Sequence, residues 1–389
     1  MLKIRTINSI AVAGLERFPR DRYEVASELS NPDAILLRSH DLHDETIPAS
    51  VLAVARAGAG VNNIPVQALS ERGVVVFNTP GANANAVKEL VVAGMLLAAR
   101  NIPQALEFTA GLDGDDNAMH VAVEAGKKRF VGTELEGKTL GVIGLGAIGV
   151  RVANVAIGLG MRVVGFDPAM SVERALQLST QVRIARSVGE VLVRADFVSL
   201  HVPLVEATRG FIDETRLAAM KPDACLLNFS RDGIVDDKAL FARLNGGGLR
   251  AYVCDFPGSM LQAHPRVIAL PHLGASTAEA EQNCAVMAAE QLRDFLEHGN
   301  IANSVNYPAV SMPRSDGYRL AIANQNVPNM LGQISTCLAQ ADLNILDMLN
   351  RSRGEAAYTL TDVDPRPDDA VLEALRAIRG VRSVRLVTA

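Results

Sequence analysis

The feature that most constrains the fold of this chain is a glycine-rich turn at residues 140–149, with the sequence LGVIGLGAIG. Apolar residues before the turn are typical of a buried parallel strand, and a helical pattern follows it. Gly144, Gly146 and Gly149 have the GxGxxG spacing, which allows a tight turn, close approach of the backbone to a pyrophosphate and close packing of the next helix. That helix would present free N–H groups, at Ala147 and Ile148 among others, and the positive end of its dipole to the phosphates. The turn predicts a doubly wound α/β domain that binds a dinucleotide.

Asp167 ends the next apolar run, 161–166, at the distance of about 20 residues from the glycines where such folds place an acid. A carboxylate there accepts hydrogen bonds from the adenosine ribose and repels a 2′-phosphate. Glycines alone also occur in purely structural turns. A strand, a helix and an acid in this order instead favour binding of NAD over NADP.

The composition bounds the class of protein. A chain of 389 residues is too long for one core and predicts two or three domains. The net charge of −5 argues against nucleic acid or an anionic membrane as the main partner, and no apolar run is long enough to span a membrane. Residues 1–22 lack the pattern of a secretory signal. The four cysteines form no CxxC pair, so we expect no metal site and a cytoplasmic protein with reduced thiols.

Short apolar runs between turn residues predict α/β architecture on both sides of the glycine turn. Strands are predicted at 34–37, 51–54, 74–77, 196–201, 224–229 and 250–255, helices at 85–100, 215–220, 237–244 and 275–298, and a loop at 111–117. A linker with two prolines, 303–315, follows the last of these helices. The remaining pattern is β-α-β-β-α-β, a ferredoxin-like plan, with strands at 318–323, 345–349, 356–363 and 381–387 and helices at 329–339 and 369–378.

Two side chains follow predicted strands, where ligands of open α/β sheets bind. Arg231 has a planar fork that can hold a carboxylate through two parallel hydrogen bonds. His272 is a candidate acid/base, because imidazole exchanges protons near neutral pH. Taken alone, each residue is better explained by a structural role, as a side chain that caps the following helix.

Together these segments resemble the D-2-hydroxyacid dehydrogenase family, and nearly the whole chain matches its branch that acts on 3-phosphoglycerate and ends in an ACT domain. The resemblance rests on segments in the family's order and spacing: RAGAGVNNI at 56–64, NTP at 78–80, GTEL at 132–135, the glycine turn, HVP at 201–203, SR at 230–231 and PHLGAS at 271–276. It implies a flavodoxin-like substrate domain of residues 1–80 and 275–305. A Rossmann-type NAD domain, 81–274, is inserted in it, and an ACT domain, 316–389, follows.

The resemblance also implies roles for individual residues. The active site would lie in the cleft between the first two domains, with Arg231 binding the substrate carboxylate, His272 as acid/base and Asp255 contacting the nicotinamide carboxamide. The matching substrate-side positions are Arg38, Ser39, Arg56, Gly58 and Asn83. The further cofactor-side positions are Pro203, Thr208, Phe229, Ser230 and Gly274.

The chain departs from the family after Asp255, because the segment up to Met260 lacks the glutamate that usually hydrogen-bonds the catalytic histidine. The partner of His272 is therefore left open. The basic run 127–129 lies where the family can lend a cation to the phosphate across a dimer, although such runs are usually solvated surface.

The last domain resembles ACT modules that bind serine between subunits. Members of that group carry His-x-Asn-x-Pro-Gly, whereas this chain has Asn324, Asn326 and Asn329 at the first, third and last positions of the segment, with Asn344 at a second side-chain position. The alternatives are a serine sensor and a purely oligomerising module, in a homodimer or a homotetramer.

The expected reaction is NAD-dependent oxidation of 3-phosphoglycerate to 3-phosphohydroxypyruvate, the step that opens serine synthesis. One alternative is another 2-hydroxyacid dehydrogenase, acting on glyoxylate, hydroxypyruvate or lactate. The other is a non-enzymatic NAD-sensing regulator on the same fold, which the presence of both Arg231 and His272 disfavours.

Overall fold

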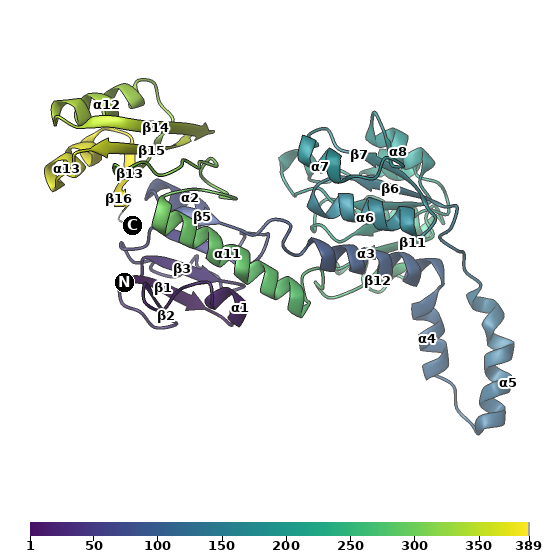
Figure 1. Cartoon of the computed structure of the whole chain (residues 1–389). Coiled ribbons are helices and arrows are strands. Elements are labelled where there is room, and N and C mark those ends of the chain that lie inside the picture. Colours follow the sequence, from purple (N-terminus) through teal and green to yellow (C-terminus); the bar gives the residue numbers. More distant parts are fainter. Residues whose placement is uncertain (388–389) are drawn as a thin grey trace. The chain divides into compact units, whose positions relative to one another are not determined.

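The computed structural model describes residues 1–387, and their contacts divide the chain into two compact units. One unit contains Met1–Asn83 together with the chain from Ala278 onward, and the other contains Ala84–Thr277 (Figure 1). The second unit is thus an insertion in the first.

The inserted unit is built on a seven-stranded parallel sheet with the order β12-β11-β10-β9-β6-β7-β8, the arrangement of a doubly wound dinucleotide-binding fold. Its central strands are buried on both faces and consist mostly of apolar residues. The strands are β6 (Thr139–Ile143), β7 (Arg162–Phe166), β8 (Arg183–Ile184), β9 (Phe197–Leu200), β10 (Cys225–Asn228), β11 (Ala251–Cys254) and β12 (Val267–Ala269).

Two apolar clusters cover the two faces of this sheet. One contains the buried residues of α3 (Ala84–Ala99) and α6 (Ala147–Gly158). The other contains those of α8 (Val188–Arg194), α9 (Glu214–Ala219) and α10 (Asp237–Asn245), and the short α7 (Val172–Gln177) follows β7.

The predicted loop at 111–117 is shorter than expected, because it lies between two further helices. These are α4 (Ile102–Ala110) and α5 (Asp116–Gly126), which extend from the sheet as a pair (Figure 1). The acidic cluster that suggested a loop also begins α5, since the side chain of Asp115 accepts a hydrogen bond from the N–H of Ala118. A 3-10 turn, η1 (Lys127–Phe130), follows α5.

The other unit has a five-stranded parallel sheet with the flavodoxin-like order β2-β1-β3-β4-β5. Two strands at its start, β1 and β2, were not predicted from the sequence. Its elements are β1 (Leu2–Ile7), α1 (Val12–Leu15), β2 (Tyr23–Ala26), β3 (Ala34–Leu37), β4 (Ala53–Arg56), α2 (Val66–Glu71), β5 (Val75–Phe77) and α11 (Ala278–His298). The helix α11 begins three residues later than predicted.

A four-stranded antiparallel sheet, with the order β14-β15-β13-β16, completes this unit. Its elements are β13 (Tyr318–Gln325), α12 (Met330–Gln340), β14 (Asn344–Arg353), β15 (Ala356–Asp364), α13 (Asp369–Ala377) and β16 (Val381–Val387). This βαββαβ order is ferredoxin-like, so the predicted fold class is confirmed.

The C-terminal sheet is covered on both faces. Leu320 and Ile322 pack with α12 and α13, whereas Ala321, Ala323 and Tyr358 belong to the same apolar cluster as α11 and β5. The sheet therefore shares a core with the N-terminal half of its unit.

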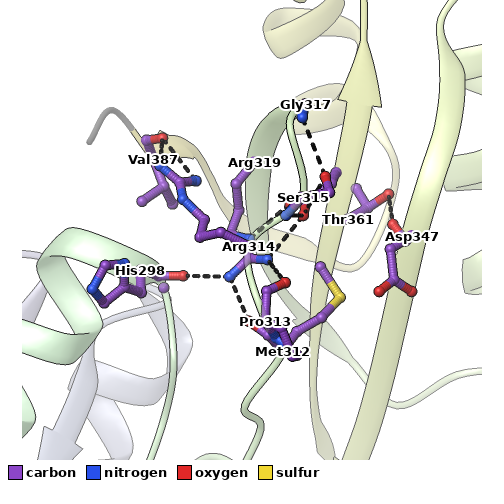
Figure 2. A network of polar contacts seen from close by, with 12 residues as sticks. His298, Met312, Pro313, Arg314, Ser315, Gly317, Arg319, Asp347, Thr361 and Val387 are labelled. Carbon is purple, nitrogen blue, oxygen red and sulfur yellow. Dashed lines mark hydrogen bonds and ion pairs between the residues drawn. The ribbon is translucent and has the colours of Figure 1, made fainter.

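A buried ion pair joins these parts. Figure 2 shows the network of polar contacts around its arginine, Arg319. The Arg319 side chain on β13 and the Asp362 side chain on β15 are both fully buried, with Nε donating to Oδ1 at 2.7 Å and Nη2 donating to Oδ2 at 2.9 Å. The other three guanidinium N–H groups donate to the carbonyls of His298, Met312 and Pro313. All five donors of Arg319 are thus used, and they tie the end of α11 and the linker to the sheet.

Within residues 1–387, we find no helix with the length and apolar character needed to cross a membrane.

Candidate active site

The glycine turn joins β6 to α6 in the geometry predicted for a phosphate-binding loop. Gly144 has φ +94°, and a Cβ there would lie 2.4 Å from the carbonyl oxygen of His201. A Cβ on Gly149 would lie 1.9 Å from the carbonyl oxygen of Gly144, so packing requires both glycines. A Cβ on Gly146, by contrast, would have no atom within 4 Å of it, so there is open space at the N-terminus of α6.

Asp167 follows β7 and lies beside this turn. Its Oδ2 accepts a hydrogen bond from the N–H of Leu145 at 2.8 Å, and its Oδ1 accepts one from the N–H of Ala169 at 2.8 Å. Gly146, as N-cap of α6, has no side chain to occupy the first N–H groups of that helix. The structure therefore brings the acid and the helix N-terminus together, as an adenosine ribose and a pyrophosphate require.

Arg231 follows β10 and is held by its own loop. Its Nη1 donates to the carbonyl of Ser230 at 2.6 Å, and its own carbonyl accepts a hydrogen bond from Nδ2 of buried Asn228. The Ser230 hydroxyl donates to the carbonyl of Leu200 at the end of β9. These bonds fix the backbone beneath Arg231 at the carboxyl edge of the sheet, where the sequence predicted it.

His272 follows β12, and its ring packs on the ring of Phe256, with the centroids 4.4 Å apart. Asp255 is buried beside them, and its Oδ2 accepts a hydrogen bond from the N–H of Gly274 at 3.1 Å. Burial raises the pKa of Asp255, which the Gly274 hydrogen bond and the charge of His272 partly offset. Phe256 is a contact of the candidate acid/base that the sequence did not reveal.

Asp255 also carries a buried oxygen, Oδ1, that has no hydrogen-bond partner within residues 1–387. Such an oxygen is an acceptor that a ligand donor would satisfy. The amide of a nicotinamide ring supplies a donor of this kind, so the site fits the role that the sequence resemblance implied for Asp255.

A second histidine, His201, begins the HVP segment at 201–203. Its Nε2 lies 2.9 Å from the Ser199 hydroxyl oxygen, and burial lowers the pKa of the imidazole to about 4. His201 is therefore neutral near pH 7. Its carbonyl packs against the glycine turn, which gives it a structural role and leaves His272 as the candidate acid/base.

The other cofactor-side positions lie in the same unit. Thr208 donates to the carbonyl of Pro203 and caps the 3-10 turn η2 (Glu206–Thr208), and Phe229 is buried against Gly94 of α3. In the basic run, Lys127 pairs with Glu124, while the Arg129 guanidinium lies 4.4 Å from the ring centre of Phe108.

The substrate-side positions gather in the other unit, at the carboxyl ends of its parallel strands. Arg38 and Ser39 follow β3, Arg56 ends β4 and Gly58 follows it, and Asn83 follows β5. Arg56 Nε donates to the carbonyl of Arg38 at 2.8 Å, and the Arg56 side chain lies against Gly58. Asn83 Oδ1 is buried without a partner in the described part of the chain.

The three asparagines of the C-terminal domain are not brought together within one chain. Asn324 and Asn326 lie where β13 ends, near Glu355, whereas Asn344 begins β14 opposite Asp364. By strand rise the two ends are roughly 25 Å apart. Asn324 Oδ1 is buried without a partner among residues 1–387.

Comparison with known proteins decides the family. Residues 92–274 match the model for the D-isomer specific 2-hydroxyacid dehydrogenase, NAD binding domain. A D-3-phosphoglycerate dehydrogenase of Methanocaldococcus jannaschii is 35% identical over 94% of this chain and 68% of its own. The chain belongs to the D-isomer-specific 2-hydroxyacid dehydrogenases. A D-3-phosphoglycerate dehydrogenase of Haemophilus influenzae is 33% identical to this dehydrogenase, over 94% of this chain and 89% of its own.

Among solved structures, an NAD⁺-bound 3-phosphoglycerate dehydrogenase of Entamoeba histolytica is similar to this dehydrogenase. The TM-score is 0.62 and the identity 26%, and the match covers 78% of this chain and 98% of the other. The predicted cofactor, NAD, is confirmed by this match and by the family model.

Proposed function

We propose that this dehydrogenase oxidises 3-phosphoglycerate to 3-phosphohydroxypyruvate with NAD, and so opens serine synthesis. The observation that carries the proposal is the placement of Arg231 and His272 at the carboxyl edge of the sheet that holds the glycine turn. The names of the relatives support 3-phosphoglycerate as the substrate.

In this proposal each group acts on a defined atom. When bound, NAD would supply the acceptor for the hydride that leaves C2 of the substrate. Arg231 binds the substrate carboxylate through its guanidinium fork and orients C2. An imidazole nitrogen of His272 takes the hydroxyl proton during oxidation. Phe256 holds the His272 ring in place by packing, in a chain that lacks the family's glutamate at this position.

The substrate phosphate needs cations that the carboxylate does not use. Arg38 and Arg56 are such groups, placed side by side at the ends of β3 and β4. We expect Arg56→Ala to raise KM for 3-phosphoglycerate at least 5-fold more than KM for D-glycerate, which lacks the phosphate. Steady-state kinetics on the two acids measures this difference. An equal loss on both would show that Arg56 serves the carboxylate or the fold.

Cofactor choice depends on Asp167 in this account. Replacing it by serine removes the carboxylate that accepts from the ribose and repels a 2′-phosphate, so NAD affinity should fall and the preference for NAD over NADP should narrow about 10-fold or more. Fluorescence titration with NADH and NADPH gives both dissociation constants. Equal binding of the two cofactors by the parent protein would contradict the assignment.

We also propose that the protein works in the cytoplasm as a homodimer or homotetramer. The four cysteines are free thiols, which fits a reducing compartment. The helices α4 and α5 bury only Gly126 between them and leave Leu106 and Val121 exposed. Short helices with so little buried surface are marginal alone, and a second copy would cover them.

For the C-terminal domain we propose serine regulation at a site made by two chains. The free edge of β14 supports this: antiparallel pairing of two β14 edges would bring Asn344 of one copy toward Asn326 of the other. Asparagine amides can donate to a carboxylate and accept from an ammonium group. Asn324, which stands where serine-binding relatives have a histidine, lies beside that end, and its buried Oδ1 has no partner in the part of the chain that the structure describes.

This proposal predicts that serine inhibits the enzyme and that Asn326→Ala and Asn344→Ala each weaken serine binding by 10-fold or more, because each removes one half of the same site. Calorimetry on the full chain is the suitable measurement, since removing the C-terminal domain would uncover the core it shares with α11. Glu373→Ala, an exposed position on α13 away from β14, is the control. If serine neither binds nor inhibits the parent, the domain is an assembly module only.

A further inference from the structure

An acid, Glu281 in the first turn of α11, contacts a cation of the substrate side. Its Oε1 accepts a hydrogen bond from Arg38 Nη2 at 2.6 Å. The Arg38 and Glu281 side chains are 37% and 40% exposed, so a ligand from solvent can reach both. The Glu281 carboxylate thus binds the Arg38 guanidinium, which an anionic substrate would need.

The position of Arg38 does not depend on this ion pair. Its carbonyl accepts hydrogen bonds from Arg56 Nε at 2.8 Å and from Asn63 Nδ2 at 3.4 Å, and both groups lie on other segments of the same unit. Arg38 also follows directly after β3, whose four residues are all buried. The backbone of Arg38 is therefore fixed whether or not Glu281 holds the side chain.

The charges of the two guanidiniums and of the carboxylate all act on one buried thiol. Burial raises the pKa of Cys284, the charges of Arg38 and Arg56 act to lower it, and the charge of Glu281 acts to raise it. The net charge of this cluster is accordingly one positive unit in place of two. Each unit of positive charge strengthens the binding of a phosphate monoester, because such a group carries up to two negative charges near neutral pH.

We propose that Glu281 is a specificity-determining residue that competes with the substrate phosphate for Arg38 and so sets the affinity for phosphorylated substrates. The inference rests on the proposed function, in which Arg38 is a substrate-side group. On binding, the phosphate takes the N–H donors of Arg38 and Glu281 leaves them. The released carboxylate stays in the first turn of α11, where the helix dipole favours negative charge.

The test is the substitution Glu281→Gln, which keeps an oxygen acceptor for Arg38 and removes only the charge. KM for 3-phosphoglycerate should fall about 3- to 10-fold with kcat within about 2-fold, because an uncompensated charge is removed within a few ångströms of the phosphate. KM for D-glycerate should change less than about 2-fold. Glu279→Gln is the matched control on the same exposed turn and should behave as the parent.

A second background separates competition from a structural effect. Arg38→Gln should raise KM for 3-phosphoglycerate. In a protein that carries Arg38→Gln, adding Glu281→Gln should no longer lower this KM. An unchanged or raised KM in Glu281→Gln, or an equal change on both acids, would overturn the inference. Inorganic phosphate, used as an inhibitor against whichever 2-hydroxy acid is oxidised, should bind Glu281→Gln more tightly than the parent. An enzyme that oxidises D-glycerate but not 3-phosphoglycerate would contradict the proposed function, and the phosphate titration would still decide the role of Glu281.

Discussion

His272→Ala should lower kcat by about 10²- to 10⁴-fold, the usual worth of a positioned acid/base. The imidazole packs on Phe256 at the end of β12, so its removal takes away the proton acceptor without touching the glycine turn. NADH binding, followed by fluorescence, should therefore stay within about 3-fold of the parent. Phe256→Leu is the companion variant: it keeps the imidazole and loosens its packing, and should give a smaller fall in kcat.

His201→Asn is the control for this prediction. Burial of its ring lowers the pKa of His201 to about 4, so His201 is neutral near pH 7 and takes no part in proton transfer here. Its replacement should affect stability more than the pH profile of kcat. If His272→Ala retained more than half of the parent's kcat, His272 would not be the acid/base.

The second large effect is on stability. Asp362→Asn removes the charge that neutralises buried Arg319, and breaking a buried ion pair from one side costs about 3–5 kcal/mol of the free energy of unfolding. Urea unfolding followed by circular dichroism measures the loss. Asp364→Asn is the control, because Asp364 lies at the exposed end of the same strand. Equal unfolding midpoints for the two variants would show that the network of Figure 2 does not stabilise the domain.

The same pair gives a pH dependence with a definite sign. Burial opposes ionisation of Asp362, but hydrogen bonds from Arg319 and Ser315 bring its pKa below the usual value. A group whose pKa is lowered by folding contributes stability that is present above its unfolded pKa, about 4, and is lost as pH falls through the folded value. The parent should therefore lose more stability than Asp362→Asn on acidification below pH 4.

Much of the inserted unit could be predicted because its central strands are buried on both faces and are mostly apolar. The strand β10 was predicted to within one residue at each end for this reason. The strand β1 escaped because only Ile4 is fully buried in it, and Lys3 and Arg5 break the apolar run. Runs of turn-forming residues also begin helices, which is why the predicted loop 111–117 included the first two residues of α5.

The residues that surround the candidate groups were harder to predict. Phe256 follows Asp255 directly, but nothing in its spacing reveals a ring contact with a residue 16 positions later. The pairing of Arg319 with Asp362 could have been suspected from the sequence. Each is the one charged residue inside a predicted apolar strand, and their charges are opposite. The register that makes them direct neighbours comes only from the pairing of β13 with β15.

The most direct test of the central claim is an NAD-reduction assay at 340 nm with a panel of 2-hydroxy acids: D-3-phosphoglycerate, D-glycerate, D-lactate and glycolate. The account predicts that kcat/KM for D-3-phosphoglycerate exceeds that for every unphosphorylated acid by 100-fold or more, with NAD preferred to NADP. A higher kcat/KM for any unphosphorylated acid would contradict the proposed substrate. No turnover of any acid, in a protein that still binds NADH, would contradict the assignment of an enzyme and favour an NAD-sensing regulator on the same fold.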